Sequence, residues 1–188
     1  MARKGNRKGQ GVHRDLGRRE GRTVLPLHQL CNDTHHLRRA GWAVVSIQER
    51  DVPVDATSRE PYRAESEADR FVQGLGLRPL GYTWLRVDGE NARIIARHLL
   101  RQDLAYRQPL MTGEEAAGLA KRFFAFLPGS HWYGTNIRPG NQPEGKRLDP
   151  DRLGDGWGWN SLTEHTFDGG VVAINATHIG ILCFADED

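Results

Sequence analysis

The sequence has few cysteines and no long hydrophobic run, two shortages that each exclude a class of protein, and it also has few lysines. Two cysteines among 188 residues, Cys31 and Cys183, are too few for a disulfide-rich secreted scaffold. No apolar run approaches the roughly 20 residues of a transmembrane helix, and no hydrophobic segment follows the basic N-terminus as in a secretory signal. We therefore expect a cytoplasmic protein without a membrane span. Arginine far outnumbers lysine, which is typical of GC-rich genomes and favours a bacterial source.

What is present indicates one globular domain with a basic appendage. The composition, 38% hydrophobic and 27% charged, is that of a soluble globular protein. The net charge of +2 hides an asymmetry: residues 1–39 hold ten basic and three acidic residues, whereas residues 40–188 hold sixteen basic and twenty-one acidic residues. A basic arm on an acidic body carries information about binding partners rather than about the fold.

The basic arm comprises residues 1–23, which offer almost nothing to bury. Such a segment cannot offset its ordering entropy, so we predict that it is disordered and that residues 24–188 form a single domain. One hypothesis is that the arm binds the phosphates of nucleic acid or a ribosome. The alternative is a solubilising tail. The basic residues of the arm are Arg3, Lys4, Arg7, Lys8, Arg14, Arg18, Arg19 and Arg22.

The most hydrophobic stretch lies near the C-terminus and predicts a β-hairpin. Two apolar runs, residues 171–174 and 179–184, flank a polar break. Both faces of both runs are apolar, which is typical of strands covered on both sides, so we place this hairpin in the middle of a sheet. Folding it back brings Asp168 opposite the Ala185–Asp186 region.

The remaining patterns complete an α+β fold with a mostly antiparallel sheet and about four helices. Residues 112–115 form a capping box of Thr and Glu, which opens the last helix. Helices are predicted at 25–40, 62–75, 91–107 and 114–127, and further strands at 42–50, 80–88 and 132–137.

The hairpin end gathers acidic residues and suggests two functions. If Asp168 and Asp186 converged, they could hold a divalent metal for hydrolysis, with His165 as the base. Alternatively, Asp186, Glu187 and Asp188 form an acidic patch that receives a basic protein surface, or a solubilising end that blocks edge pairing.

A long segment, residues 138–160, is rich in glycine, proline and aspartate. Loops of this length inside a domain are usually functional or mobile. Trp157 lies between two glycines and Trp159 follows the second of them, and with Trp132 they are candidate contacts for a protein partner. The alternative for the two loop tryptophans is that they fold back on the core.

One stripe of possible metal ligands occurs on the first predicted helix. His28, Cys31 and His35 are spaced i, i+3 and i+7, but this spacing matches no standard zinc module. A core cysteine flanked by boundary histidines is the simpler interpretation, so we predict no metal and no cofactor.

The function best supported by these patterns is non-enzymatic recognition of a protein partner. The loop tryptophans and the acidic hairpin end would form the contact surface, as in inhibitor or immunity proteins that bind basic nucleases. The alternatives are a nucleic-acid or ribosome-associated protein and a divalent-metal-dependent hydrolase.

Overall fold

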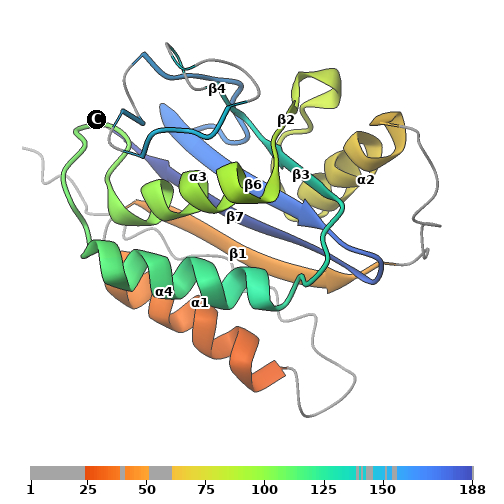
Figure 1. Cartoon of the computed structure of the whole chain (residues 1–188), viewed down its shortest axis with the longest axis horizontal. Helices are drawn as coiled ribbons and strands as arrows, with labels where there is room; N and C mark the ends of the chain where they lie inside the picture. The colour runs from red at the N-terminus through yellow and green to blue at the C-terminus, as the bar shows by residue number, and fades with distance from the viewer. Residues whose placement is uncertain are drawn as a thin grey trace, which may run out of the picture.

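The computed structural model describes residues 24–38, 41–50, 61–138, 140, 142, 146–150, 152–153 and 156–187. Within these residues the fold is α+β, as the sequence predicts (Figure 1). The α-helices are α1 (Val24–Arg38), α2 (Pro61–Gly74), α3 (Gly89–Arg101) and α4 (Gly113–Ala125). The main sheet contains β1 (Trp42–Glu49), β2 (Leu85–Arg86), β3 (Trp132–Thr135), β6 (Phe167–Ile174) and β7 (His178–Asp186), and a small sheet pairs β4 (Ile137–Arg138) with β5 (Gly158–Trp159).

The C-terminal hairpin lies in the interior of the main sheet. The strand order is β1-β7-β6-β3-β2, and every pair is antiparallel. Asp168 pairs with Ala185, and Phe167 pairs with Asp186, which is the register that the sequence predicts. The central hairpin prediction is therefore confirmed.

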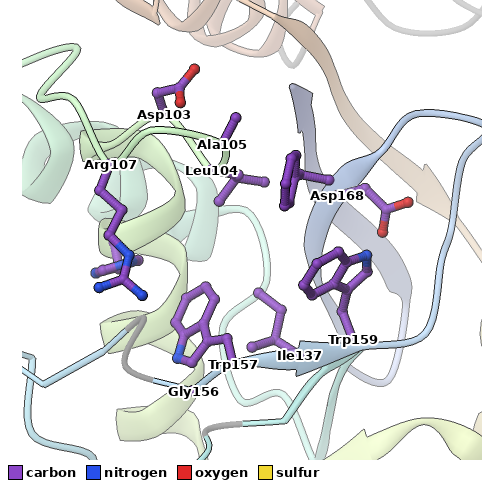
Figure 2. A pocket seen from close by; sticks show the side chains of 11 residues that line it. Asp103, Leu104, Ala105, Arg107, Ile137, Gly156, Trp157, Trp159 and Asp168 are labelled. Atoms are coloured by element: carbon purple, nitrogen blue, oxygen red, sulfur yellow. The ribbon is translucent and has the colours of Figure 1, made fainter. Parts of the chain in front are cut away.

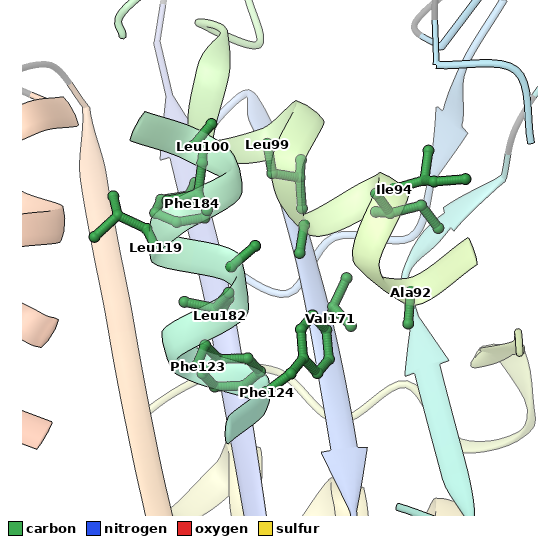
Figure 3. Packing of buried hydrophobic residues seen from close by; sticks show 14 of the residues in the cluster. Ala92, Ile94, Leu99, Leu100, Leu119, Phe123, Phe124, Val171, Leu182 and Phe184 are labelled. Carbon is green, nitrogen blue, oxygen red and sulfur yellow. The ribbon is translucent and has the colours of Figure 1, made fainter. Parts of the chain in front are cut away.

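The sheet is covered on both faces, which explains why its strands are apolar on both sides. Helices α1, α3 and α4 pack against one face and enclose the first core, which includes Phe123, Val171 and Phe184 (Figures 1 and 3). Helix α2 packs against the other face and encloses the second core, which includes Val172 and Ile181. Alternate residues of one strand thus enter two different cores.

Helix starts follow local capping chemistry. The side chain of Asp88 accepts a hydrogen bond of 2.7 Å from the backbone N–H of Asn91 at the start of α3. At α4 the hydroxyl of Thr112 accepts from the backbone of Glu115, whose carboxylate accepts from the backbone of Thr112, so the predicted capping box is confirmed. These bonds to Thr112 lower the pKa of Glu115.

Helix α3 is shorter than the sequence predicts, and the difference creates part of the candidate site. The helix ends at Arg101 rather than at residue 107. The chain then makes a tight turn in which the N–H of Asp103 donates to the carbonyl of Gln108 and Gln102 bridges Pro109. We call residues 102–109 the α3 turn. It interrupts a helical pattern that is continuous in the sequence.

The segment predicted as a strand at residues 80–88 is mostly not a strand. It contains a 3-10 helix, η1 (Gly81–Thr83), followed by the two-residue strand β2. The physical cause is Asp69 of α2, whose carboxylate accepts from the backbone of Leu80 and Gly81 and from the indole of Trp84. These three bonds curl the chain around one carboxylate.

Among the described residues, none of the helices has the length and hydrophobicity that a membrane span requires.

Candidate binding cavity

Trp157 and Trp159, two residues apart in the sequence, line the same cavity. Its volume is about 230 Å³, and it lies between the end of α3, the α3 turn, the small sheet and the start of β6. Figure 2 shows the two indoles on different sides of the cavity, with Ile137 between them and Leu104 opposite. We call this site the tryptophan cavity.

The small sheet fixes Trp159. Ile137 of β4 pairs with Trp159 of β5, so both side chains lie on the same face of the small sheet. The ring of Trp159 also lies 5.4 Å from the ring of Phe167, which is another lining residue. The neighbouring Asn160 donates its backbone N–H to the carbonyl of Asn136, and the side chain of Asn136 donates back to the carbonyl of Asn160.

Trp157 packs on a neutral histidine. The rings of Trp157 and His98 are 4.7 Å apart and tilted by 50°. Burial lowers the pKa of His98 to about 4, and the guanidinium groups of Arg101 and Arg107 contribute to this shift. At neutral pH the imidazole is therefore uncharged, and the positive charge near this wall belongs to the two arginines.

The α3 turn supplies the remaining wall and holds Arg107 in an unusual conformation. Arg107 has φ of 57°, and it is the one non-glycine residue with positive φ in the described chain. Its backbone N–H donates to the carbonyl of Asp103, and the carboxylate of Asp103 accepts from the backbone of Tyr106 at 2.6 Å. The left-handed conformation costs an arginine about 1 kcal/mol that a glycine would not pay. The side chain placed this way lines the cavity (Figure 2).

The turn is also tied to the sheet through a buried ion pair. Asp186 accepts two hydrogen bonds from the guanidinium of Arg38, at 2.7 and 3.2 Å, and one of 2.8 Å from the backbone of Leu104. The side chains of Arg38 and Asp186 are 1% and 2% exposed. Gly41 has φ of 71°, and any Cβ at this position would collide with the Asp186 carboxylate. Asp186 therefore joins α1, β7 and the cavity wall.

The candidate catalytic residues do not come together. Asp168 and Asp186 are on neighbouring strands but at positions of opposite parity, so their side chains project to opposite faces of the sheet. Asp168 is buried and accepts hydrogen bonds from Asn136, from the backbone of Leu162 and from both the backbone and the hydroxyl of Thr163.

His165 belongs to a third environment. Its ring nitrogen lies 2.8 Å from the Glu187 carboxylate, and its ring is 5.9 Å from that of Trp42. Although Asp168 borders the cavity, Figure 2 shows its carboxylate directed away from the centre. Across the described ranges, no group of three His, Cys, Asp or Glu side chains is arranged to hold a metal ion.

The other residues predicted to contact a partner do not form one exposed surface among the described residues. Trp132 is only 2% exposed and packs edge-on against Trp84 in the second core, so it offers no contact surface. Asp186 is likewise buried, whereas Glu187 is exposed. Asp188 and the basic arm, residues 1–23, lie outside the described residues.

The predicted ligand stripe on α1 has other contacts. The thiol of Cys31 donates to the carbonyl of Val45 at 3.4 Å, and burial raises its pKa. The ring of His28 is hydrogen-bonded to the side chain of Asn32 at 3.2 Å. His35 is exposed on the same helix.

Sequence reasoning missed the α3 turn and its residues. His98, Tyr106 and Arg107 look like members of one amphipathic helix when only the periodicity is considered. Pro109 gave no usable signal for this helix end, because it lies well beyond Arg101, whereas a proline that marks a helix end usually follows within about one to three residues.

Comparisons of the chain with protein-family models, with curated proteins and with solved structures found no match.

Proposed function

We propose that this protein is a non-enzymatic binding protein, of the inhibitor or immunity type, that recognises a protein partner at the tryptophan cavity. The observation that supports this most directly is the placement of Trp157 and Trp159 on one cavity. Two large aromatic side chains around one opening provide the pocket that an anchor residue of a partner fills in many protein interfaces.

The size of the cavity supports recognition of a side chain over binding of a cofactor. Pockets for drug-sized ligands usually measure about 300–1,000 Å³. The tryptophan cavity, at about 230 Å³, is below this range. It has room for one large side chain or one planar ring, and the rest of a partner would contact the rim.

The rim has the composition of an interaction hot spot. Tyr106 on the α3 turn is 62% exposed, and the neighbouring Arg107 is also exposed. Arg101 is exposed at the end of α3. Tryptophan, tyrosine and arginine are the residues that most often dominate binding energy in protein interfaces.

This proposal places the contact surface at the cavity and not at the acidic end of the hairpin. Asp168 and Asp186 are buried and bonded inside the protein, so neither carboxylate is available to a partner. The same burial removes support for a metal-dependent hydrolase that uses these carboxylates. Nucleic-acid binding is a second candidate, because exposed arginines adjoin an aromatic cavity on which a base could stack.

The test is partner recovery with a matched pair of variants. Affinity purification of the full chain should recover a discrete protein partner, and Trp157→Ala should reduce that recovery at least about tenfold because it removes a cavity wall. Tyr82→Ala is the control, since Tyr82 is 87% exposed and does not line the cavity. Equal recovery with both variants would refute a role for the cavity, and recovery of only nuclease-sensitive material would favour the second candidate.

A further inference from the structure

We infer that residues 102–107 are a two-state gate of the tryptophan cavity. In the described state they form most of the α3 turn, which supplies one wall of the cavity and is held by the ion pair of Arg38 and Asp186. In the second state they continue α3 as an α-helix and leave this side of the cavity open. The second state follows from the backbone geometry, whereas its effect on binding rests on the proposed function.

The composition of the gate favours a helix over a turn. Residues 102–107 read Gln-Asp-Leu-Ala-Tyr-Arg, in which only Asp103 is a residue typical of turns. Glutamine, leucine, alanine and arginine are good helix formers. Leu104 follows Leu100 by four residues and so continues the apolar face of α3. The turn therefore depends largely on tertiary contacts, in conflict with the local preference.

A short break in the backbone separates α3 from a further helical turn. The N–H of Arg107 donates to the carbonyl of Asp103 at 3.0 Å, which is the hydrogen bond between residues four apart that an α-helix repeats. Between this turn and the end of α3 at Arg101 lies Gln102, whose φ of −128° and ψ of 147° are extended. Rotation of the backbone around this break would join the two helical parts.

The buried ion pair occupies the partners of two missing helical hydrogen bonds. In a continuous α-helix each N–H donates to the carbonyl four residues earlier. The N–H of Leu104 donates instead to the carboxylate of Asp186 at 2.8 Å. The carbonyl of Leu99, which is the helical acceptor for Asp103, accepts instead from Nε of Arg38 at 3.4 Å. The ion pair thus stabilises the break, and its removal would leave these backbone groups to the helix.

The conformation of Arg107 disfavours the turn, and the length of the chain permits the helix. Arg107 has φ of 57°, a left-handed conformation that a helical arginine avoids. Helical residues 102–107 would lengthen α3 by about 9 Å. Residues 108–110 reach roughly 10 Å when extended, so they can still connect the longer helix to Met111, which is buried in the first core.

The helical state would take apart one wall of the cavity. Leu104, Ala105 and Arg107 line the cavity in the described state (Figure 2). When these residues continue α3, Leu104 releases Asp186 and the wall that the turn supplies is lost. The turn is therefore the state that presents the cavity, and a partner that fills the cavity shifts the equilibrium towards the turn.

The test removes the ion pair from the full chain with Arg38→Met/Asp186→Ala. Loss of both partners leaves neither charge buried alone, and it frees the N–H of Leu104 for a helical bond. We expect the ¹³Cα chemical shifts of residues 102–107 to become helical by NMR. The control Asp33→Ala/Arg122→Met removes a half-exposed pair between α1 and α4 and should keep the shifts of the turn.

Two single variants test the same equilibrium without disturbing the buried ion pair. Arg107→Gly and Arg107→Ala both lack the guanidinium, so they differ mainly in backbone preference. Glycine favours the left-handed turn and disfavours a helix, whereas alanine does the reverse, and we expect the helical state to be about thirtyfold more populated in the alanine variant. Relaxation-dispersion NMR of residues 102–107 measures these populations.

The remaining outcomes separate the gate from the proposed function. Turn shifts or random-coil shifts in Arg38→Met/Asp186→Ala would refute the gate, and so would equal helical populations in the two Arg107 variants. If recovery of a partner depends on Trp157 but is equal for Arg107→Gly and Arg107→Ala, the gate does not regulate binding. If no recovery depends on Trp157, the proposed function fails, while the NMR measurements still decide whether the gate exists.

Discussion

At the scale of single residues, His98 makes the stability of the protein dependent on pH. The folded protein holds the pKa of this imidazole at about 4, below its ordinary value near 6.5. Between these two values the unfolded chain binds a proton that the folded chain does not. Neutral His98 therefore contributes on the order of 3 kcal/mol to the free energy of unfolding. This contribution is fully present above about pH 6.5 and is lost as the pH falls towards about 4.

The variant His98→Phe tests this effect, because phenylalanine retains a ring against Trp157 but does not titrate. Urea unfolding of the natural sequence should show lower stability at about pH 5 than at about pH 7, and the variant should lose a large part of this difference. An unchanged difference in the variant would assign the pH dependence to other groups.

The left-handed backbone conformation of Arg107 should make this position sensitive to substitution. With φ of 57°, glycine should suit this position better than alanine, the reverse of the usual order. We expect Arg107→Gly to be more stable than Arg107→Ala by about 1 kcal/mol in denaturant unfolding. Equal stability would show that the turn relaxes without strain.

At the scale of elements, the ion pair between Arg38 and Asp186 holds α1, β7 and the α3 turn together. Asp186→Asn would leave a buried guanidinium without its counter-charge, and we expect a loss of about 3–5 kcal/mol in the free energy of unfolding. Asp33→Asn is the matched control, because the pair of Asp33 with Arg122 is 39% and 40% exposed and such pairs contribute at most about 1 kcal/mol. Similar losses in the two variants would contradict the structural role of burial.

The C-terminal hairpin and α4 show where prediction from the sequence succeeds. The two apolar faces of the hairpin and the capping box of α4 are local patterns, and both were predicted correctly. The prediction of a strand at residues 80–88 was wrong for a reason that lies outside this segment. The carboxylate of Asp69, eleven residues before Leu80, accepts hydrogen bonds from three donors of the segment. A side chain from outside residues 80–88 therefore overrode the local β propensity of these residues.

At the scale of the whole molecule, the cavity could not be predicted, because its walls come from distant parts of the chain. His98 on α3, Arg107 on the turn, Ile137 on β4 and Trp159 on β5 meet only after the sheet has formed. The two tryptophans could be selected from the sequence as candidates. Their common cavity depends on tertiary packing.

The strand order has a consequence for synthesis on the ribosome. Strand β1 precedes every other described strand in the chain, yet its neighbour in the sheet is β7, with Trp42 opposite Ala185. The nascent chain must therefore carry an apolar strand without its partner until nearly all of the described sequence has emerged. Strand β7 also brings Asp186, which fixes the wall of the cavity. Incomplete chains should consequently be prone to pair with one another, and the ability to bind should arise only when translation has passed β7.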